Sequence, residues 1–425
     1  MDLVLKNCKL VDEIYSYYIG IENGKIKTIS KSPIKGDETI DIENNILSSG
    51  FIDPHVHFRD PGFIEKETFK TGSMAAANGG FTTIFDMPNT KPETNTYKNF
   101  KNKLKIAKNK SVVDFGLHSG MNDLDEIRKI AELKPISFKM FMDTHSNQEI
   151  EKNFKNISSL NKESNTNYKL SLHCENKKII EENTNSFIEK EVSAIDHSHI
   201  RNTNSEVNSV NQSLNLSEKY NVPIHICHLS TNKALKAIKR KDLVSTEVTP
   251  HHLLLTNEAF NEHGTMTKTN PPLRPVGENL SISQLKDIDI IGTDHAPHTI
   301  EDKNKGVLNS LSGIPGLETA IPLLLTQVNK GKVDLKTVLE RFSNNPAKVF
   351  NLKNKGKIAI GYDADFTVLD IKKEGKINLD NLYTKAKYSP FEGMEYKGIA
   401  IMTILRGEVV MDSGEVYSTQ GEYVS

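Results

Sequence analysis

Between residues 51 and 355 the chain alternates short apolar segments with stretches of helical periodicity, and this alternation limits the possible folds more than any other feature. The apolar segments are rich in β-branched and aromatic residues and end in polar ones, as buried strands do. Eight of them occur, at residues 50–58, 81–88, 112–120, 136–142, 168–175, 223–230, 244–250 and 287–295. The first intervening helix is expected over 66–80, where the Gly79–Gly80 pair should end it. Eight successive strand–helix units predict an α/β fold, a (β/α)8 TIM-type barrel with its active site at the carboxyl ends of the strands.

Both ends of the chain have a different pattern. They consist of short β-branched runs broken by turn residues, as in "GKIAIGYDADFTVLDI" and "GIAIMTILRGEVVMDSGE". We therefore expect residues 1–50 and 356–425 to form one small β-sandwich domain beside a barrel that spans residues 51–355.

The amino-acid composition argues against some classes of binding partner. Lys and Arg number 54 and Asp and Glu 55, so no excess positive charge is available for nucleic acid or an anionic membrane. The three cysteines, Cys8, Cys174 and Cys227, have no paired spacing, which argues against a disulfide framework and favours a reducing, cytoplasmic setting. No apolar run approaches the roughly 18 residues of a membrane span. We expect a cytoplasmic protein that acts on a small molecule, with the Lys- and Asn-rich stretches as solvated surface.

Polar side chains stand where each expected strand ends. Residues i and i+2 of a strand point to the same side, so His55 and His57 of "DPHVHF" should face the barrel mouth together. Other strand ends supply Lys139, His173, His228 and Asp294. Imidazole nitrogen and carboxylate oxygen are ligands for Zn²⁺. A single strand histidine is more often structural, but four histidines, Lys139 and Asp294 together at the expected strand ends predict a metal site. Structural or surface roles are expected for His118, His145, His197, His199, His225, His251, His252 and His263.

Lys139 needs separate treatment, because an ammonium group repels a metal ion. A desolvated, deprotonated lysine can add CO2 and become a carbamate, an anion with two oxygens. Such a group can bridge two ions about 3.5–4 Å apart. On this interpretation His55, His57 and Asp294 hold one ion, His173 and His228 hold the other, and Lys139 binds both.

These residues resemble the metal pattern of the amidohydrolase superfamily, and their surroundings resemble its class I dihydroorotases over nearly the whole chain. The matching segments are "DPHVHFRDPG", "FDMPNTKP", "LHCE", "CHLST", "EVTPHHLLL", "TNPPLRP" and "GTDHAPHTIEDK". The resemblance implies reversible cyclisation of N-carbamoyl-L-aspartate to L-dihydroorotate in pyrimidine (UMP) biosynthesis. It further implies two Zn²⁺ or similar divalent ions per subunit, bridged by carboxylated Lys139. A metal-bridging hydroxide then attacks the ring carbonyl, and Asp294 is the catalytic general acid and base.

The resemblance also implies which residues bind the substrate. Arg59 lies two residues beyond His57, should continue the same every-second-residue row, and would pair with the substrate carboxylate. Asn89, Asn270 and His298 would hold the carboxylate and the ring amide. The segment 298–320 resembles the part that covers the substrate, with Gly313 and Gly316 suited to backbone contacts. We also expect a homo-oligomer, and association with aspartate transcarbamoylase, as in some relatives, stays open.

Three alternatives share parts of this pattern. Hydantoinases (dihydropyrimidinases) and allantoinases use the same metals on related cyclic amides, but the former lack the arginine after the paired histidines. Allantoinases generally have Asn where Arg59 stands and lack the "APH" that contains His298. A non-catalytic scaffold homologue would usually have lost a ligand, and none is lost here. Some class I dihydroorotases carry Asp in place of Lys139, where the second ion is in doubt, so the lysine favours two ions.

Overall fold

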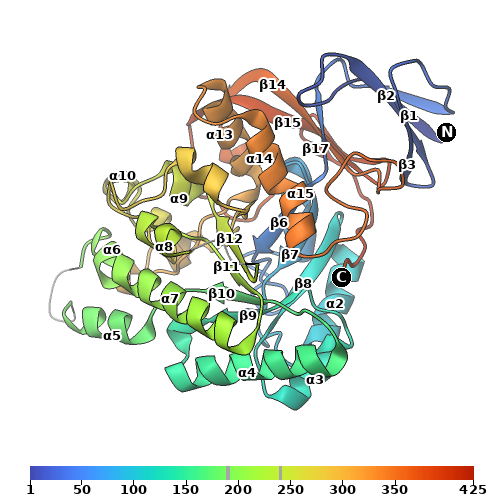
Figure 1. The fold of residues 1–425 in the computed structure, drawn as a ribbon. Helices are drawn as coiled ribbons and strands as arrows, with labels where there is room; N and C mark the ends of the chain where they lie inside the picture. Colours follow the sequence, from blue (N-terminus) through green and yellow to red (C-terminus); the bar gives the residue numbers. More distant parts are fainter. Residues whose placement is uncertain (188–191, 239–241) are drawn as a thin grey trace.

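A computed structural model describes residues 1–187, 192–238 and 242–425, and among these residues eight parallel strands form the central sheet (Figure 1). Each strand pairs with the next along the chain, and a bridge between Val56 and His295 joins the last to the first, so the barrel is nearly closed. The (β/α)8 prediction is confirmed. The strands are β6 (Phe51–Val56), β7 (Phe81–Asp86), β8 (Asp114–Gly120), β9 (Ser137–Phe141), β10 (Leu170–His173), β11 (Ile224–Ile226), β12 (Val244–Val248) and β13 (Ile290–Ile291).

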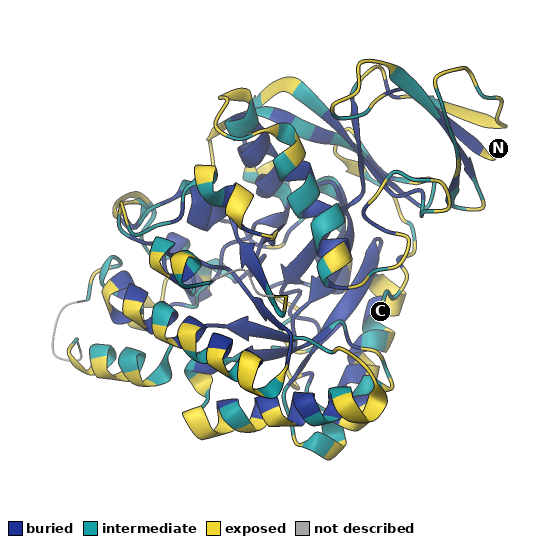
Figure 2. Cartoon of the chain, in the orientation of Figure 1, coloured by how far each residue is buried: buried dark blue, intermediate teal, exposed yellow. Residues whose placement is uncertain are grey.

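Helices surround this sheet, and Figure 2 shows their outer faces exposed while the strands are buried. The helix expected over 66–80 is α1 (Phe69–Asn78), which Thr68 caps at its start and Gly79 at its end. The described helices that follow are α2 (Tyr97–Lys110), α3 (Leu124–Ala131), α4 (Asn147–Ser164), α5 (Lys177–Asn185), α6 (Asp196–Ile200), α7 (Thr203–Tyr220), α8 (Asn232–Ala237), α9 (Pro250–Leu254), α10 (Ala259–His263), α11 (Ile300–Lys303), α12 (Gly306–Asn309), α13 (Leu317–Asn329), α14 (Leu335–Phe342) and α15 (Asn344–Val349). Short 3-10 turns lie at Met142–Thr144, Gly264–Thr267, Ile282–Asp287 and Leu379–Asn381.

The two chain ends form a second, mixed sheet, as expected. Its junction is an antiparallel pair of β5 and β14, in which Ser49 lies opposite Phe366 and Ile46 opposite Leu369. The sheet has its own apolar cluster, which includes Leu5, Ile19 and Phe366. Its strands are β1 (Leu3–Lys9), β2 (Ser16–Glu22), β3 (Lys25–Ser30), β4 (Glu38–Asp41), β5 (Ile46–Ser49), β14 (Phe366–Lys376), β15 (Glu395–Leu405), β16 (Glu408–Asp412) and β17 (Glu415–Val416).

Buried contacts fasten the second sheet to the barrel. Gly80 has φ +92°, and a Cβ at this position would lie 2.8 Å from Cγ2 of Thr367, so only glycine allows the approach. The Thr367 hydroxyl donates to the Gly80 carbonyl at 2.7 Å. Lys355 is buried between Asp114 of β8 and Asp365, 2.7 and 2.5 Å away. The barrel therefore has a fixed frame at the end of its strands opposite the site described below.

Two expectations about surface and membrane can be compared with the structure. The Lys- and Asn-rich stretches do form exposed faces of α2 and α4, but Lys103 of α2 is an exception, because its Nζ is buried 2.5 Å from Asp86. Cys8, Cys174 and Cys227 are buried free thiols. None of the described helices is long and apolar enough to cross a membrane.

Candidate active site

A pocket of about 520 Å³ lies at the carboxyl ends of the barrel strands. Nine of the ten side chains expected to bind metal or substrate line it: His55, His57, Arg59, Asn89, His173, His228, Asn270, Asp294 and His298. The tenth, Lys139, is buried on β9, where its Nζ lies 3.1 Å from Sγ of Cys227. Parallel strands all end at the same side of a barrel, which is why residues so distant in sequence meet here.

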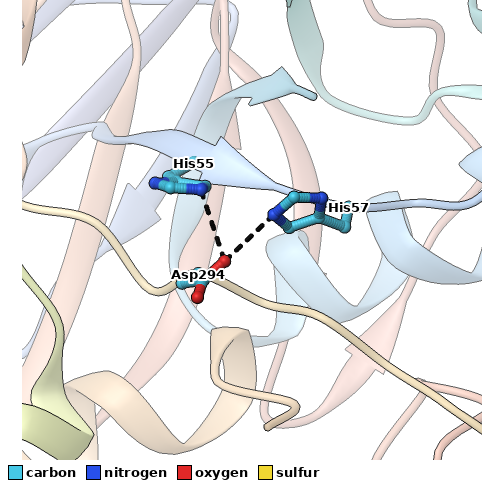
Figure 3. A group of neighbouring side chains, drawn as sticks. All are labelled: His55, His57 and Asp294. Carbon is cyan, nitrogen blue, oxygen red and sulfur yellow. Dashed lines mark hydrogen bonds and ion pairs between the residues drawn. The ribbon is translucent and has the colours of Figure 1, made fainter. Parts of the chain in front are cut away.

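The first group is formed by the two ends of the barrel sheet. His55 lies on β6, His57 directly follows it, and Asp294 follows β13. Figure 3 shows both imidazoles facing the Asp294 carboxylate, with Nε2 of His55 3.3 Å and Nε2 of His57 3.0 Å from its Oδ1. The His57 amide donates to the His295 carbonyl at 2.8 Å, so closure of the barrel holds these three side chains together.

A second pair lies beside the first. His173 ends β10 and His228 follows β11, and Nδ1 of His173 lies 3.0 Å from Nε2 of His228. The His228 ring is also 5.2 Å from that of His55, measured between ring centroids. The four imidazoles therefore form one cluster with two sets of inward-facing nitrogen atoms.

Carboxylate and amide groups hold the outward nitrogen of three of these rings. Glu247 accepts from Nδ1 of His55 at 2.7 Å, Asn89 from Nδ1 of His57 at 2.7 Å, and Glu175 contacts Nε2 of His173 at 2.8 Å. A partner on the outward nitrogen fixes the orientation of the ring and directs the other nitrogen into the pocket. The remaining atoms, imidazole nitrogen and carboxylate oxygen, are the donor types that zinc-like ions take. The residues therefore fit a metal centre.

Burial and neighbouring charges shift the pKa values of His55, His57 and Asp294. Burial opposes a positive charge on His55, but the Glu247 carboxylate outweighs it and raises the pKa of His55 to about 10. Burial, with Arg59 nearby, lowers the pKa of His57 to about 3. Burial would raise the pKa of the Asp294 carboxyl, but His55 and His57 hold it well below its usual range. Asp294 is therefore an anion at neutral pH.

The backbone is strained at three of the residues in this site. Arg59, His228 and Asp294 have φ values of +61°, +34° and +47°, in the left-handed region that ordinary side chains avoid. Such strain collects at functional sites, where the surrounding structure has to maintain it. The expected row of alternating residues therefore does not extend to Arg59, because β6 ends at Val56 and a left-handed turn aims this side chain.

Arg59 nevertheless reaches the pocket wall. Its side chain is buried, its Nε donates to the Pro297 carbonyl at 3.4 Å, and its Nη2 lies 3.2 Å from Nε2 of His298. Burial and Arg59 lower the pKa of His298 to about 2, so its ring is neutral and supplies no charge beside the guanidinium. Among the described residues no carboxylate lies within 4.0 Å of the Arg59 guanidinium. A buried cation without an anionic partner is costly, so this position favours an anionic ligand.

Several charged residues of the site were not identified from the sequence. Glu247 lies inside the barrel beside Gly292, where a Cβ would come within 2.6 Å of its Cδ. Glu175 follows His173 by two positions, and Arg201 binds it through Nε at 2.9 Å and also contacts Asp143 at 2.6 Å. Glu247 could have been identified from the sequence, because it is an ionisable residue inside an expected buried strand. The contacts of Arg201 with Glu175 and Asp143 could not have been predicted from the residues near Arg201 in the sequence.

His197 also differs from expectation. A structural or surface role was expected, but it lines the pocket and contacts Asn270. His118 on β8 and His225 on β11 are buried and lie within hydrogen-bond distance of Ser137 and Ser245, which agrees with the structural roles expected for them.

A (β/α)8 barrel whose strand ends carry this cluster of histidine and aspartate side chains has the arrangement of a metal-dependent enzyme. The chain belongs to the amidohydrolase family, whose pattern matches residues 46–410. Several curated relatives are named dihydroorotase: one from Methanosphaera stadtmanae is 46% identical over 100% of this chain and 99% of its own. Another, from Methanothermobacter thermautotrophicus, is 45% identical over 100% and 97%. The resemblance noted in the strand-end motifs is thereby confirmed.

Solved structures show the same architecture. The L-hydantoinase (dihydropyrimidinase) of Arthrobacter aurescens has a TM-score of 0.94 and 31% identity, with 100% of this chain and 99% of that chain covered. The dihydropyrimidinase of Brevibacillus agri has a TM-score of 0.91 and 25% identity, with 100% and 98% covered. The barrel and its companion sheet are thus a shared framework, and only the pocket residues can distinguish the substrates.

Proposed function

We propose that the chain catalyses the dihydroorotase reaction, the reversible cyclisation of N-carbamoyl-L-aspartate to L-dihydroorotate in pyrimidine biosynthesis. The observation that carries this proposal is the position of Arg59, a buried guanidinium without a carboxylate partner among the described residues, in the same pocket as His55, His57 and Asp294. A ring that carries a carboxylate supplies the missing anion. The names of the relatives support the same reaction.

The metal part of the proposal is a pair of divalent ions, with zinc as the preferred species. His55, His57 and Asp294 would hold one ion and His173 with His228 the other. Lys139 would join both as a carbamate, because a buried ammonium group beside metal ligands is unfavourable and the carbamate replaces it with an anion. Bound ions of this kind polarise a carbonyl and supply a hydroxide at neutral pH.

The protein residues have separate tasks. Asp294 moves the proton: in the hydrolytic direction its carboxylate takes a proton from the attacking water and delivers it to the leaving ring nitrogen. Arg59 and His298 bind the ring carboxylate from one wall. Asn89 and Asn270, which also line the pocket, orient the ring. Such fixed orientation is itself a large part of catalysis.

Opening of an uncharged cyclic amide is the second candidate, favoured by the likeness to L-hydantoinase. A substrate without a carboxylate would leave the Arg59 guanidinium buried and unpaired, which is unfavourable. Dihydroorotate therefore fits this pocket better.

The cellular location of the enzyme and its assembly with other chains are also part of the proposal. Three buried free thiols agree with a cytoplasmic location. A homo-oligomer, and association with aspartate transcarbamoylase, are proposed from the family resemblance alone. Sedimentation of the purified chain, alone and with that partner, tests both.

The activity itself is tested by following dihydroorotate opening and carbamoyl-aspartate cyclisation with zinc-loaded and chelator-treated protein. The proposal expects turnover in both directions that is lost with the metal. Absence of turnover from protein that retains two zinc ions per chain would overturn it.

A further inference from the structure

The side-chain amide of Asn270 is held on one side only. Its Oδ1 accepts from Nε2 of His197 at 2.9 Å and from the hydroxyl of Ser312 at 3.1 Å. Its Nδ2 has no acceptor among the described residues, and Asn270 lines the pocket. The amide has therefore two donors behind its oxygen and its own N–H groups free for a ligand.

The contact with His197 can be assigned in only one way. The same Nε2 lies 3.0 Å from the Thr269 carbonyl oxygen, which can only accept, so Nε2 must carry the proton. Burial, with Lys268 nearby, lowers the pKa of His197 to about 3, so the ring is neutral and Nε2–H is its one N–H donor. The Asn270 atom beside it must then be the oxygen.

Ser312 is equally well fixed, because two buried lysines hold its segment. Nζ of Lys303 donates to the carbonyls of Leu311 and Gly313 at 3.1 and 3.0 Å. Nζ of Lys268 donates to the carbonyl of Ser310 at 2.6 Å. Nε2 of His298 lies 3.0 Å from the Ser312 carbonyl oxygen, so the segment also contacts the part of the pocket that carries Arg59.

Asn89, which also lines the pocket, has the same polarity. Its Oδ1 accepts from Nδ1 of His57 at 2.7 Å, which leaves its Nδ2 free among the described residues. Together with Arg59, these amides give the pocket hydrogen-bond donors from three residues. Such a surface selects a ligand that presents acceptors, and it rejects one that presents N–H groups at those points.

We propose that His197 and Ser312 are positioning residues that orient the Asn270 amide with Nδ2 toward the pocket, so that this wall recognises a carboxylate or carbonyl oxygen of the substrate. The inference rests on the proposed function and deepens it. Neither residue touches the reacting atoms. Both act on substrate binding through Asn270.

A double-mutant cycle tests whether His197 acts through Asn270. His197→Leu should raise KM for dihydroorotate about tenfold, the value of one lost hydrogen bond, with kcat changed less than about threefold. His197→Gln retains an N–H and should restore KM to within about threefold of wild type. In an Asn270→Ala background, His197→Leu should change KM less than about twofold, since the residue it orients is absent. His199→Leu, two residues along the same short helix and exposed, is the matched control.

Ser312→Ala should behave like His197→Leu. A His197→Leu effect of equal size in both backgrounds would show that the residue acts independently of Asn270, and would overturn the inference. A large fall in kcat together with the rise in KM in His197→Leu, if His197→Gln does not restore either value, would also overturn the inference.

Asn270→Asp tests whether the N–H groups of the Asn270 side chain face the ligand. An aspartate keeps the two interactions behind it but turns an acceptor toward the ligand, so kcat/KM should fall at least about fivefold below that of Asn270→Ala. Asn270→Asp equal to or better than Asn270→Ala would overturn the assigned polarity. Failure of the proposed function is distinguishable, because wild type would then turn over no dihydroorotate, whereas failure of this inference leaves wild-type turnover intact.

Discussion

Nε2 of His57 lies 3.0 Å from Oδ1 of Asp294, although the two residues are separated by 237 positions in the chain. They meet because the first and last strands of the barrel are neighbours where it closes. The same closure brings Arg59 and His298 to one wall, so the proposed metal site and the proposed carboxylate site share one structural origin. The following predictions test the two parts separately.

Arg59→Lys should lower kcat/KM for dihydroorotate about 10- to 100-fold while zinc content stays unchanged. Lysine keeps the charge but cannot form the bidentate contact with a carboxylate, and a charge-assisted hydrogen bond is worth about 1.5–3 kcal/mol. Steady-state kinetics and metal analysis on the same preparation measure both effects. Arg128→Lys at an exposed ion pair is the control. Equal turnover in Arg59→Lys and wild type would rule out the carboxylate role.

Lys139→Ala should lose metal and activity together, because no carbamate can then join the two ions. A short carboxylic acid added in excess should restore part of both by filling the space. Metal analysis by mass spectrometry and turnover with and without the acid provide the readouts. One ion per chain in the fully active wild type would contradict the bridging role.

Asp294→Asn should lower turnover in both directions by at least about 1,000-fold, because the amide can neither take the proton nor supply a charge to the ion. A melting curve close to that of wild type would show that the variant is folded. Substantial residual activity in a folded variant would remove Asp294 from the proposed proton transfer.

Glu247→Gln should weaken zinc binding about 10- to 100-fold, the usual effect of removing a carboxylate behind a metal-binding histidine. The glutamine keeps the shape but loses the charge that orients His55. Competition with a chelator measures the affinity. Glu206→Gln, another buried glutamate that is paired with Arg274, is the control. Equal affinities in the two variants would contradict the role of Glu247.

His197 should make the metal-free protein less stable in acid. The usual histidine pKa of 6.5 applies to the unfolded chain, whereas burial lowers that of folded His197 to about 3. Between these values the unfolded chain binds a proton that the folded chain does not, so stability falls as the pH falls from 6.5 toward 3. One such group contributes up to about 1.4 kcal/mol per pH unit.

His197→Gln should therefore make the free energy of unfolding depend less steeply on pH between 6.5 and 4, with no change in slope above pH 7.5. Urea unfolding at several pH values provides the comparison. Parallel slopes for the variant and wild type would show that His197 is not held neutral in the folded protein.

The residues that could be placed from the sequence follow simple rules. Alternation along a strand set His55 and His57 on one side, and the order of strands in a barrel returned Asp294 to them. The length of the alternating region and the β-rich chain ends were enough for the two-part fold. Local periodicity and one topological rule therefore explain most of the architecture.

The residues that were misplaced or missed depend on tertiary contacts. Arg59 is aimed by a left-handed turn, not by strand alternation, and the sequence shows no sign of that backbone conformation. Glu247 orients His55 only because the barrel closes. His197 lies on the short helix α6, outside the strand–helix pattern, and its contact with Asn270 joins two segments that are 73 positions apart in the chain.

The most direct test of the central claim is steady-state turnover of dihydroorotate, hydantoin and allantoin by one zinc-loaded preparation. If the buried Arg59 guanidinium selects a ring carboxylate, kcat/KM for dihydroorotate should exceed that for either uncharged ring by at least about 100-fold. A preference for hydantoin or allantoin would contradict the account.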